Sequence, residues 1–145
     1  MGMNTKSRRQ AAERAWTLMF RILMSSSGSR TESLSRRGLT PNDARALWSL
    51  DPKIARPIGE LAREWTCDPS NATFIIDRLE KAGWAERRLS DADRRVKLIG
   101  LTRSGVKMRA ELEAEYHKPP PELLNLDDAD LLALERALQK IALTK

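Results

Sequence analysis

The sequence predicts a mainly α-helical fold that carries one small β-hairpin. Apolar residues recur at helical spacing along most of the chain. One stretch differs, because residues 84–101 contain two strand-like runs on either side of a polar, arginine-rich tip. The expected order of elements is therefore α-α-α-α-β-β-α-α. The length of 145 residues fits one compact domain and is too short for two.

The N-terminal third is expected to form helices with clear breaks between them. A first helix is predicted over residues 8–27, and the serine-rich segment Ser25–Ser29 predicts a break at its end, with a short helix after it. Thr40 and Pro41 begin the next helix, because a threonine cap and a proline at the first helical position both favour a helix start. The Asp-Pro pair at residues 51–52 ends it.

Two short helices joined by a tight turn are predicted in the middle of the chain. Pro57 opens the first, Thr66 and Cys67 form the turn, and Asp68 caps the second, which ends at Gly83. Their apolar faces are Ile58, Leu61, Ala62 and Trp65 in the first, and Ala72, Ile75, Ile76 and Leu79 in the second. This pair is a helix-turn-helix unit. Because the strands Trp84–Leu89 and Val96–Leu101 follow directly, the layout is that of a winged helix-turn-helix.

Two further helices are predicted after the hairpin. Thr102 caps a long helix that runs to about Lys118, where the three prolines at 119–121 stop it. Asp127 caps a last helix. Its apolar residues recur at the spacing of a helix-helix seam and are Leu131, Leu134, Leu138 and Ile141.

The polar face of the second short helix and the hairpin tip are the candidate DNA-binding surfaces. Short polar side chains near a helix N-terminus can reach base edges in the major groove, and an arginine can enter a narrow minor groove. The candidates on the helix are Pro69, Ser70, Asn71, Thr73, Phe74 and Arg78, and those on the tip are Asp93, Arg94 and Arg95. Asp93 is expected to hold the Arg95 guanidinium in one direction. The alternatives are an ordinary solvated helix face and a tip whose acids and arginines neutralise one another.

Composition and charge narrow the function further. The net charge is +6, with basic residues concentrated in 1–50 and 78–109 and acidic residues in 111–130, which fits a polyanion-binding face or simply a solvated surface. The single cysteine, Cys67, and the single histidine, His117, cannot form a metal site or a disulfide, so a reducing, cytoplasmic location is expected. We predict no enzyme activity and no cofactor, because no nucleophile-base pair or phosphate loop is present. No run is apolar enough to span a membrane.

The ordered set of motifs resembles the MarR family of bacterial winged-helix transcription regulators. The resemblance covers about residues 39–105 and rests on the segments Leu39–Pro41, Arg45–Leu47, Ile58–Ala62, Asp68–Thr73, Asp77–Arg87, Asp93–Arg95 and Leu101–Gly105. It implies one domain over 1–145, with a DNA-binding unit at about 39–105 and dimerisation helices at about 8–35 and 106–145. It also implies that helix 69–82 reads the major groove while Arg95 enters the minor groove. Phe74 departs from the family pattern, since many relatives have a basic or small residue there.

The resemblance also implies partners. Members of the family commonly bind small phenolic or other aromatic compounds between the dimer arms and the DNA-binding unit. Candidate residues for such a pocket are Trp16, Phe20, Met24 and Trp48, although the same residues fit a plain apolar core. Cys67 is either an oxidant sensor or a small residue that fills the turn.

The sequence therefore predicts a sequence-specific DNA-binding regulator. It is expected to be a repressor that binds double-stranded DNA at a pseudo-palindromic operator as a homodimer and is released by a small aromatic effector. An activator fits the same motifs. The alternative function is a winged-helix module that binds DNA without sequence preference or binds other proteins.

Overall fold

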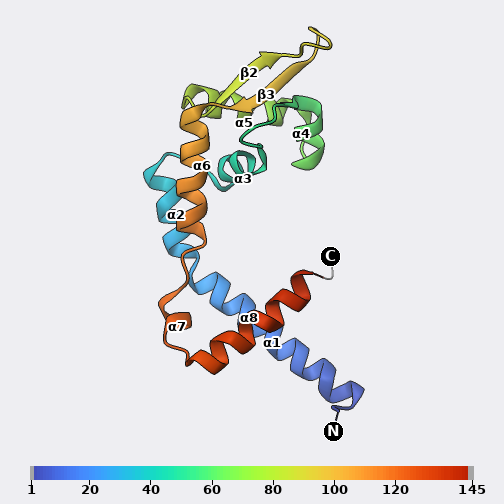
Figure 1. The fold of residues 1–145 in the computed structure, drawn as a ribbon, viewed down its shortest axis with the longest axis vertical. Coiled ribbons are helices and arrows are strands. Elements are labelled where there is room, and N and C mark those ends of the chain that lie inside the picture. The colour runs from blue at the N-terminus through green and yellow to red at the C-terminus, as the bar shows by residue number, and fades with distance from the viewer. Residues whose placement is uncertain (1, 144–145) are drawn as a thin grey trace.

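The computed structural model describes residues 2–143 and shows an elongated chain with a winged helix-turn-helix at one end and two helical arms at the other (Figure 1). The helices are α1 (Thr5–Ser25), α2 (Ser27–Arg36), α3 (Pro41–Ser49), α4 (Ile58–Glu64), α5 (Pro69–Lys81), α6 (Arg103–Tyr116), α7 (Pro121–Leu124) and α8 (Asp128–Ala142). The strands are β1 (Arg56–Pro57), β2 (Ala85–Leu89) and β3 (Lys97–Leu101). The predicted fold class is confirmed, and α2, β1 and α7 are the elements that the predicted order α-α-α-α-β-β-α-α does not include.

The three strands form one antiparallel sheet in the order β1-β3-β2. In the β2–β3 hairpin, Arg87 lies opposite Ile99, and the tip comprises residues 90–96. Strand β1 adds two residues to the other edge of β3, with Arg56 opposite Ile99. A strand of two residues has no alternation of apolar and polar side chains, so the sequence carries no signal for it.

The predicted helix starts are confirmed in atomic detail. At each of four starts, a side-chain oxygen of the cap accepts the backbone N–H three residues later, which satisfies a donor that the helix leaves free. The cap and donor pairs are Thr40 with Asp43 (3.2 Å), Asp68 with Asn71 (2.8 Å), Thr102 with Gly105 (3.0 Å) and Asp127 with Asp130 (2.9 Å). Gly83 follows α5 with φ of +80°, the left-handed cap that the sequence predicts.

The serine-rich segment separates α1 from α2 by a single residue. Ser26 lies between the two helices and keeps a right-handed helical conformation. The hydroxyls of Ser25, Ser26 and Ser27 donate to the carbonyls of Ile22, Leu23 and Met24, at 2.9, 3.1 and 2.7 Å. Such bonds back to the preceding turn compete with the helical ladder and bend helices. The predicted break is therefore present, but the chain resumes as a ten-residue helix.

One apolar core holds the winged unit together. It comprises buried residues between Leu34 and Leu112, drawn from α2 to α6 and the sheet, and it includes all four residues of the predicted α5 stripe. Trp65, which ends α4, is buried, and its indole nitrogen donates to the Ser49 hydroxyl at 2.8 Å. Within the described part of the chain, α1 and α8 contribute no buried residue. The core thus positions α5 and the hairpin. The two arms, α1 and α8, lie outside it.

Gly105 lets α6 start directly against the residue that precedes the hairpin. The Thr102 backbone N–H donates to the Trp84 carbonyl at 3.1 Å, and the Thr102 hydroxyl donates to the Gly83 carbonyl at 2.6 Å. These bonds bring the first turn of α6 so close that a Cβ at position 105 would lie 1.8 Å from the Trp84 carbonyl oxygen. A glycine is therefore required there for steric reasons.

We expect Gly105→Ala to lower the free energy of unfolding by at least about 2 kcal/mol, because the added methyl group meets backbone and not a movable side chain. Urea denaturation followed by circular dichroism measures the change. Gly59→Ala in α4 is the matched control, since a Cβ there meets nothing within 4 Å. Equal stability of the two variants would contradict the steric argument.

Candidate nucleic-acid interface

Helix α5 presents one face to solvent along its whole length. Ala72, Ile75, Ile76 and Leu79 are buried in the core, and the opposite side carries the exposed residues Ser70, Phe74, Asp77 and Lys81. The predicted reading face is therefore accessible. It is anchored by the core behind it, so its side chains are held in fixed positions relative to the hairpin.

The first turn of α5 is organised by Asp68. Its carboxylate accepts the Ser70 hydroxyl at 2.6 Å and the Asn71 backbone N–H at 2.8 Å, and these two bonds lower the pKa of Asp68. The Thr73 hydroxyl donates to the Pro69 carbonyl at 2.9 Å. The hydroxyl protons of Ser70 and Thr73 are therefore engaged within the helix, while their oxygens can still accept. The Asn71 side-chain amide has no hydrogen-bond partner among residues 2–143.

Arg78 makes contacts within the protein that the sequence did not predict. Its Nε and Nη2 atoms bind the carboxylate of Asp43 at 2.8–3.2 Å, and Nη2 also donates to the Gly38 carbonyl at 3.2 Å. Asp43 is the third residue of α3 and only 1% exposed. Burial by itself would raise the pKa of Asp43, but hydrogen bonds from Arg78 and Thr40 outweigh it and lower that pKa. Two of its three guanidinium nitrogens therefore hold α5 on α3, and a contact of Arg78 with DNA stays a prediction.

Arg78→Ala should lower the free energy of unfolding by about 2 to 4 kcal/mol, because the Asp43 carboxylate would stay buried without its partner. Urea denaturation at neutral pH measures the loss. Lys81→Ala, three residues further along α5 at an exposed position, serves as the control and should change stability by less than about 0.5 kcal/mol. Similar losses in both variants would rule out a special role for the Arg78–Asp43 pair.

The arginines of the hairpin fall into two groups. Arg87 binds Asp77 and Glu80 of α5, and Arg88 binds Glu86 of its own strand. Arg94 and Arg95 are exposed at the tip, and neither guanidinium has a hydrogen-bond or ion-pair partner within residues 2–143. Arg87 thus holds the hairpin on α5, and Arg88 pairs within its own strand, whereas Arg94 and Arg95 present charge to the surroundings.

Asp93 shapes the tip through the backbone. Its carboxylate accepts the Arg95 backbone N–H at 2.9 Å, and its carbonyl accepts the Val96 N–H at 2.9 Å. The sequence-based prediction that Asp93 holds the Arg95 guanidinium is wrong for this state of the chain, because the carboxylate turns back onto the main chain. An aspartate that bonds the amide two residues later is a common turn element. Its effect is to fix where the Arg95 side chain leaves the loop.

The four residues predicted to line a ligand pocket are not brought together within one chain. Trp16, Phe20 and Met24 lie exposed on α1, with Trp16 66% exposed. Trp48 of α3 is half-buried and packs edge-on against Tyr116 of α6, with ring centroids 4.5 Å apart. A cavity instead lies where the arms meet the winged unit.

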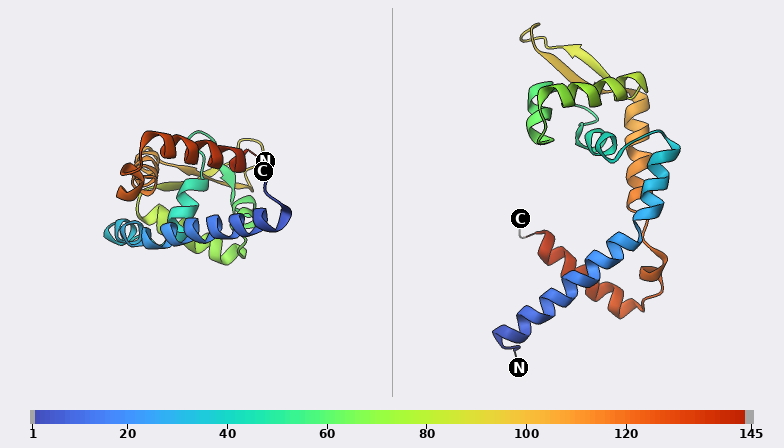
Figure 2. Two further views of the ribbon diagram at one scale, coloured as in Figure 1. Left: turned by 90° about the horizontal axis from the view of Figure 1, so that it is seen from below. Right: turned by 180° about the vertical axis from the view of Figure 1, so that it is seen from behind.

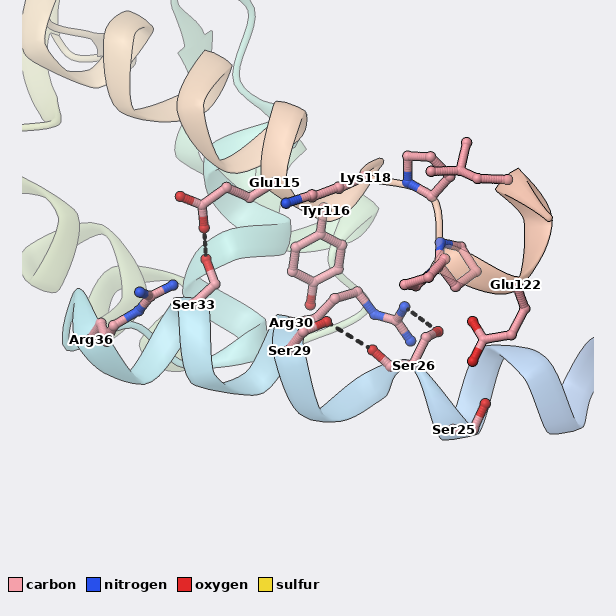
Figure 3. Close-up of a pocket in the computed structure, with 14 residues that line it drawn as sticks. Ser25, Ser26, Ser29, Arg30, Ser33, Arg36, Glu115, Tyr116, Lys118 and Glu122 are labelled. Atoms are coloured by element: carbon pink, nitrogen blue, oxygen red, sulfur yellow. Dashed lines mark hydrogen bonds between the residues drawn. The ribbon is translucent and has the colours of Figure 1, made fainter.

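This junction cavity of about 650 Å³ is lined mainly by polar residues of α2, the end of α6 and the proline linker (Figure 3). The Arg30 guanidinium binds the Ser26 hydroxyl at 2.9 Å and lies 5.8 Å from the centre of the Tyr116 ring. Glu115 accepts hydrogen bonds from Arg37, and also from Ser33, and these lower its pKa to about 2. The cavity thus combines an aromatic ring with fixed charges of both signs.

The remaining candidate residues lie away from these surfaces. Leu131, Leu134, Leu138 and Ile141 are on α8, outside the core, and Leu138 is 40% exposed. Cys67 is half-buried in the turn before α5 and packs against the core, and His117 caps the C-terminus of α6. Over the described residues, no cluster of histidine, cysteine or carboxylate side chains is arranged to hold a metal ion. Likewise, no described helix has the length and apolarity needed to cross a membrane.

Comparison with known proteins identifies the family. A model described as the MarR family matches residues 39–97. The chain is 32% identical over 108 residues to the uncharacterized HTH-type transcriptional regulator YcgE of Bacillus subtilis, a match covering 70% of this chain and 68% of the relative. The chain belongs to the MarR family. It is also 36% identical over 90 residues to the transcriptional repressor MprA of Escherichia coli, covering 61% of this chain and 51% of MprA, so it matches about half the length of that relative.

Solved MarR-family structures share the fold. A MarR family protein from Bacillus stearothermophilus has a TM-score of 0.74 and 26% identity, with 99% of this chain and all of that chain covered. A single-residue mutant of MepR from S. aureus, bound to an oligodeoxyribonucleotide, has a TM-score of 0.68 at 17% identity, with 89% of this chain and 96% of that chain covered. MarR-family proteins are transcription regulators and not enzymes.

Proposed function

We propose that this MarR-family chain is a sequence-specific DNA-binding regulator, acting as a repressor and as a homodimer. The observation that carries the proposal is the arrangement of two exposed elements at one end of the molecule (Figure 1). One is the polar face of α5, and the other is the hairpin tip with the uncompensated guanidinium groups of Arg94 and Arg95. The DNA-bound MepR relative and the repressor MprA support this reading.

The two elements suit different parts of a duplex. The N-terminal turns of α5 carry Ser70, Asn71 and Thr73, whose short side chains can approach base edges in the major groove. The hairpin extends beyond α5, so Arg95 can reach the adjacent minor groove, where a narrow A·T-rich groove attracts an arginine. The hairpin is tied to α5 by Arg87, which keeps the spacing between the two contacts constant.

The homodimer is supported by the apolar surface of the arms. Helix α1 exposes Trp16, Phe20, Leu23 and Met24, and α8 exposes Leu131 and Leu138. The two helices cross in Figure 1 but lie well apart when seen from below in Figure 2, so they do not cover one another. A large exposed apolar surface marks a protein interface. We propose that the arms of a second copy cover it, which would place two reading helices about one DNA turn apart, roughly 34 Å.

A small aromatic effector completes the proposal. The junction cavity lies between the arms and the winged unit, and it offers the Tyr116 ring next to the Arg30 guanidinium. A ligand bound there would contact both parts of the chain and could change the angle between them. A screen of small aromatic compounds for dissociation of the protein–DNA complex tests this part separately.

Specific binding is tested by selection from random-sequence duplexes, followed by competition of the selected duplex against excess unrelated DNA at near-physiological salt. We expect the selected complex to persist. If unrelated DNA displaces the selected duplex as well as the selected sequence itself does, the alternative is favoured. That alternative is a module that binds DNA without sequence preference.

Arg95→Ala should weaken binding to the selected duplex and reduce the slope of log K against log salt by about one, because one phosphate-region contact is lost. Binding measured by fluorescence anisotropy at several salt concentrations gives the slope. Arg9→Ala on α1, remote from the hairpin, is the matched control and should leave the slope unchanged. An unaltered slope in Arg95→Ala would remove this residue from the interface.

Leu138→Glu should raise the dissociation constant of the homodimer by at least about a hundredfold, because a charged group would replace an apolar contact in each copy. Sedimentation equilibrium measures this constant. Ala133→Glu adds the same side chain on another face of α8 and should leave the dimer intact. The proposed arm interface would be contradicted if the unsubstituted protein were a monomer. It would also be contradicted if the Leu138→Glu variant still formed the dimer.

A further inference from the structure

Phe74 is an exposed aromatic residue in the centre of the reading face. It is 61% exposed, and its neighbours along the face are Ser70, Asp77 and Lys81. The other large apolar residues exposed in the winged unit, Ile54 and Leu89, lie outside α5. An apolar ring on a polar surface gains free energy when a partner removes it from water. Its position on α5 makes DNA that partner.

The ring is restrained on one side. The Arg78 guanidinium lies 6.0 Å from the ring centre, one helical turn further along α5. That guanidinium is itself held by the buried carboxylate of Asp43 and by the Gly38 carbonyl. The ring therefore lies beside a fixed cation on its C-terminal side. The polar candidates Ser70 and Asn71 are located in the N-terminal turn that precedes it.

The chemistry of phenylalanine selects one feature of the major groove. The phenylalanine ring has no hydrogen-bond donor or acceptor that could bind the nitrogen and oxygen atoms of the base edges. Among the groups that the four base pairs present in the major groove, the 5-methyl group of thymine is the apolar one. Cytosine has a hydrogen atom in place of that methyl group and therefore offers the ring less apolar surface.

We propose that Phe74 determines specificity by contacting the 5-methyl group of a thymine in each half-site. This inference rests on the proposed function and adds to it the base that the residue selects. Removing that one methyl group should weaken binding about fourfold per half-site, the ratio expected for one buried methylene-sized group. Removal in both half-sites of a symmetric site should weaken it about fifteenfold.

The experiment uses the full chain and the duplex obtained from random-sequence selection. Each thymine of the selected site is replaced in turn by deoxyuridine, which removes the methyl group and leaves every hydrogen-bonding atom in place. We expect one thymine per half-site to be sensitive for the unchanged chain. Phe74→Ala should bind the thymine and deoxyuridine duplexes equally. Arg95→Ala is the matched control, since it should bind both more weakly and keep their ratio.

The outcomes separate the inference from the function that it rests on. If selection enriches no sequence, the proposed function fails and the inference fails with it. If a site is enriched but no thymine is sensitive to deoxyuridine, only the assignment of Phe74 is overturned. It is also overturned if Phe74→Ala keeps the sensitivity, because the Thr73 methyl group would then be the reader. The thymine scan on the unchanged chain needs no variant, so the absence of a sensitive thymine overturns the assignment even if Phe74→Ala does not fold.

Discussion

A carboxylate with almost no access to water holds the reading helix in place. Asp43 accepts the Thr40 backbone N–H at 2.8 Å, which starts α3, and it binds Arg78, which anchors α5. The same arginine binds the Gly38 carbonyl between α2 and α3. A buried charge is costly unless it is paired and hydrogen-bonded, so this contact constrains all three segments together. The exposed face of α5 depends on it, since a rotation of α5 would change which side chains face outward.

The hairpin shows why net charge alone is a poor guide to an interface. Its four arginines occur in two adjacent pairs, yet Arg87 and Arg88 are neutralised by carboxylates of the protein. At the tip, Arg94 and Arg95 form no ion pair with a carboxylate within residues 2–143. The position of an arginine along the hairpin therefore decides whether it forms an ion pair within the protein. The ion pairs of Arg87 and Arg88 make the hairpin more rigid. Arg94 and Arg95 contribute a positive electrostatic potential that would attract a polyanion.

The sequence predicts those features whose cause is local. The caps Thr40 and Asp68 act within three residues, and the buried stripe of α5 follows from helical period, so both were predictable. The contact of Arg78 with Asp43 was not predicted because the two residues lie 35 positions apart and no local pattern shows it. The role of Asp93 was missed because a carboxylate two residues before an arginine can bind either its side chain or its amide. The cavity depends on the angle between α2 and the proline linker, which the sequence does not encode locally.

Hydrogen bonds at the end of α2 connect the junction cavity with the exposed face of α5. Arg37 binds Glu115 at the edge of the junction cavity, and the next residue, Gly38, offers its carbonyl to Arg78. The two contacts therefore lie on adjacent residues of the segment that follows α2. Close-packed interiors convert small shifts of this kind into discrete rearrangements. If the proposed effector binds in the junction cavity, these hydrogen bonds are the connection through which it would reach α5.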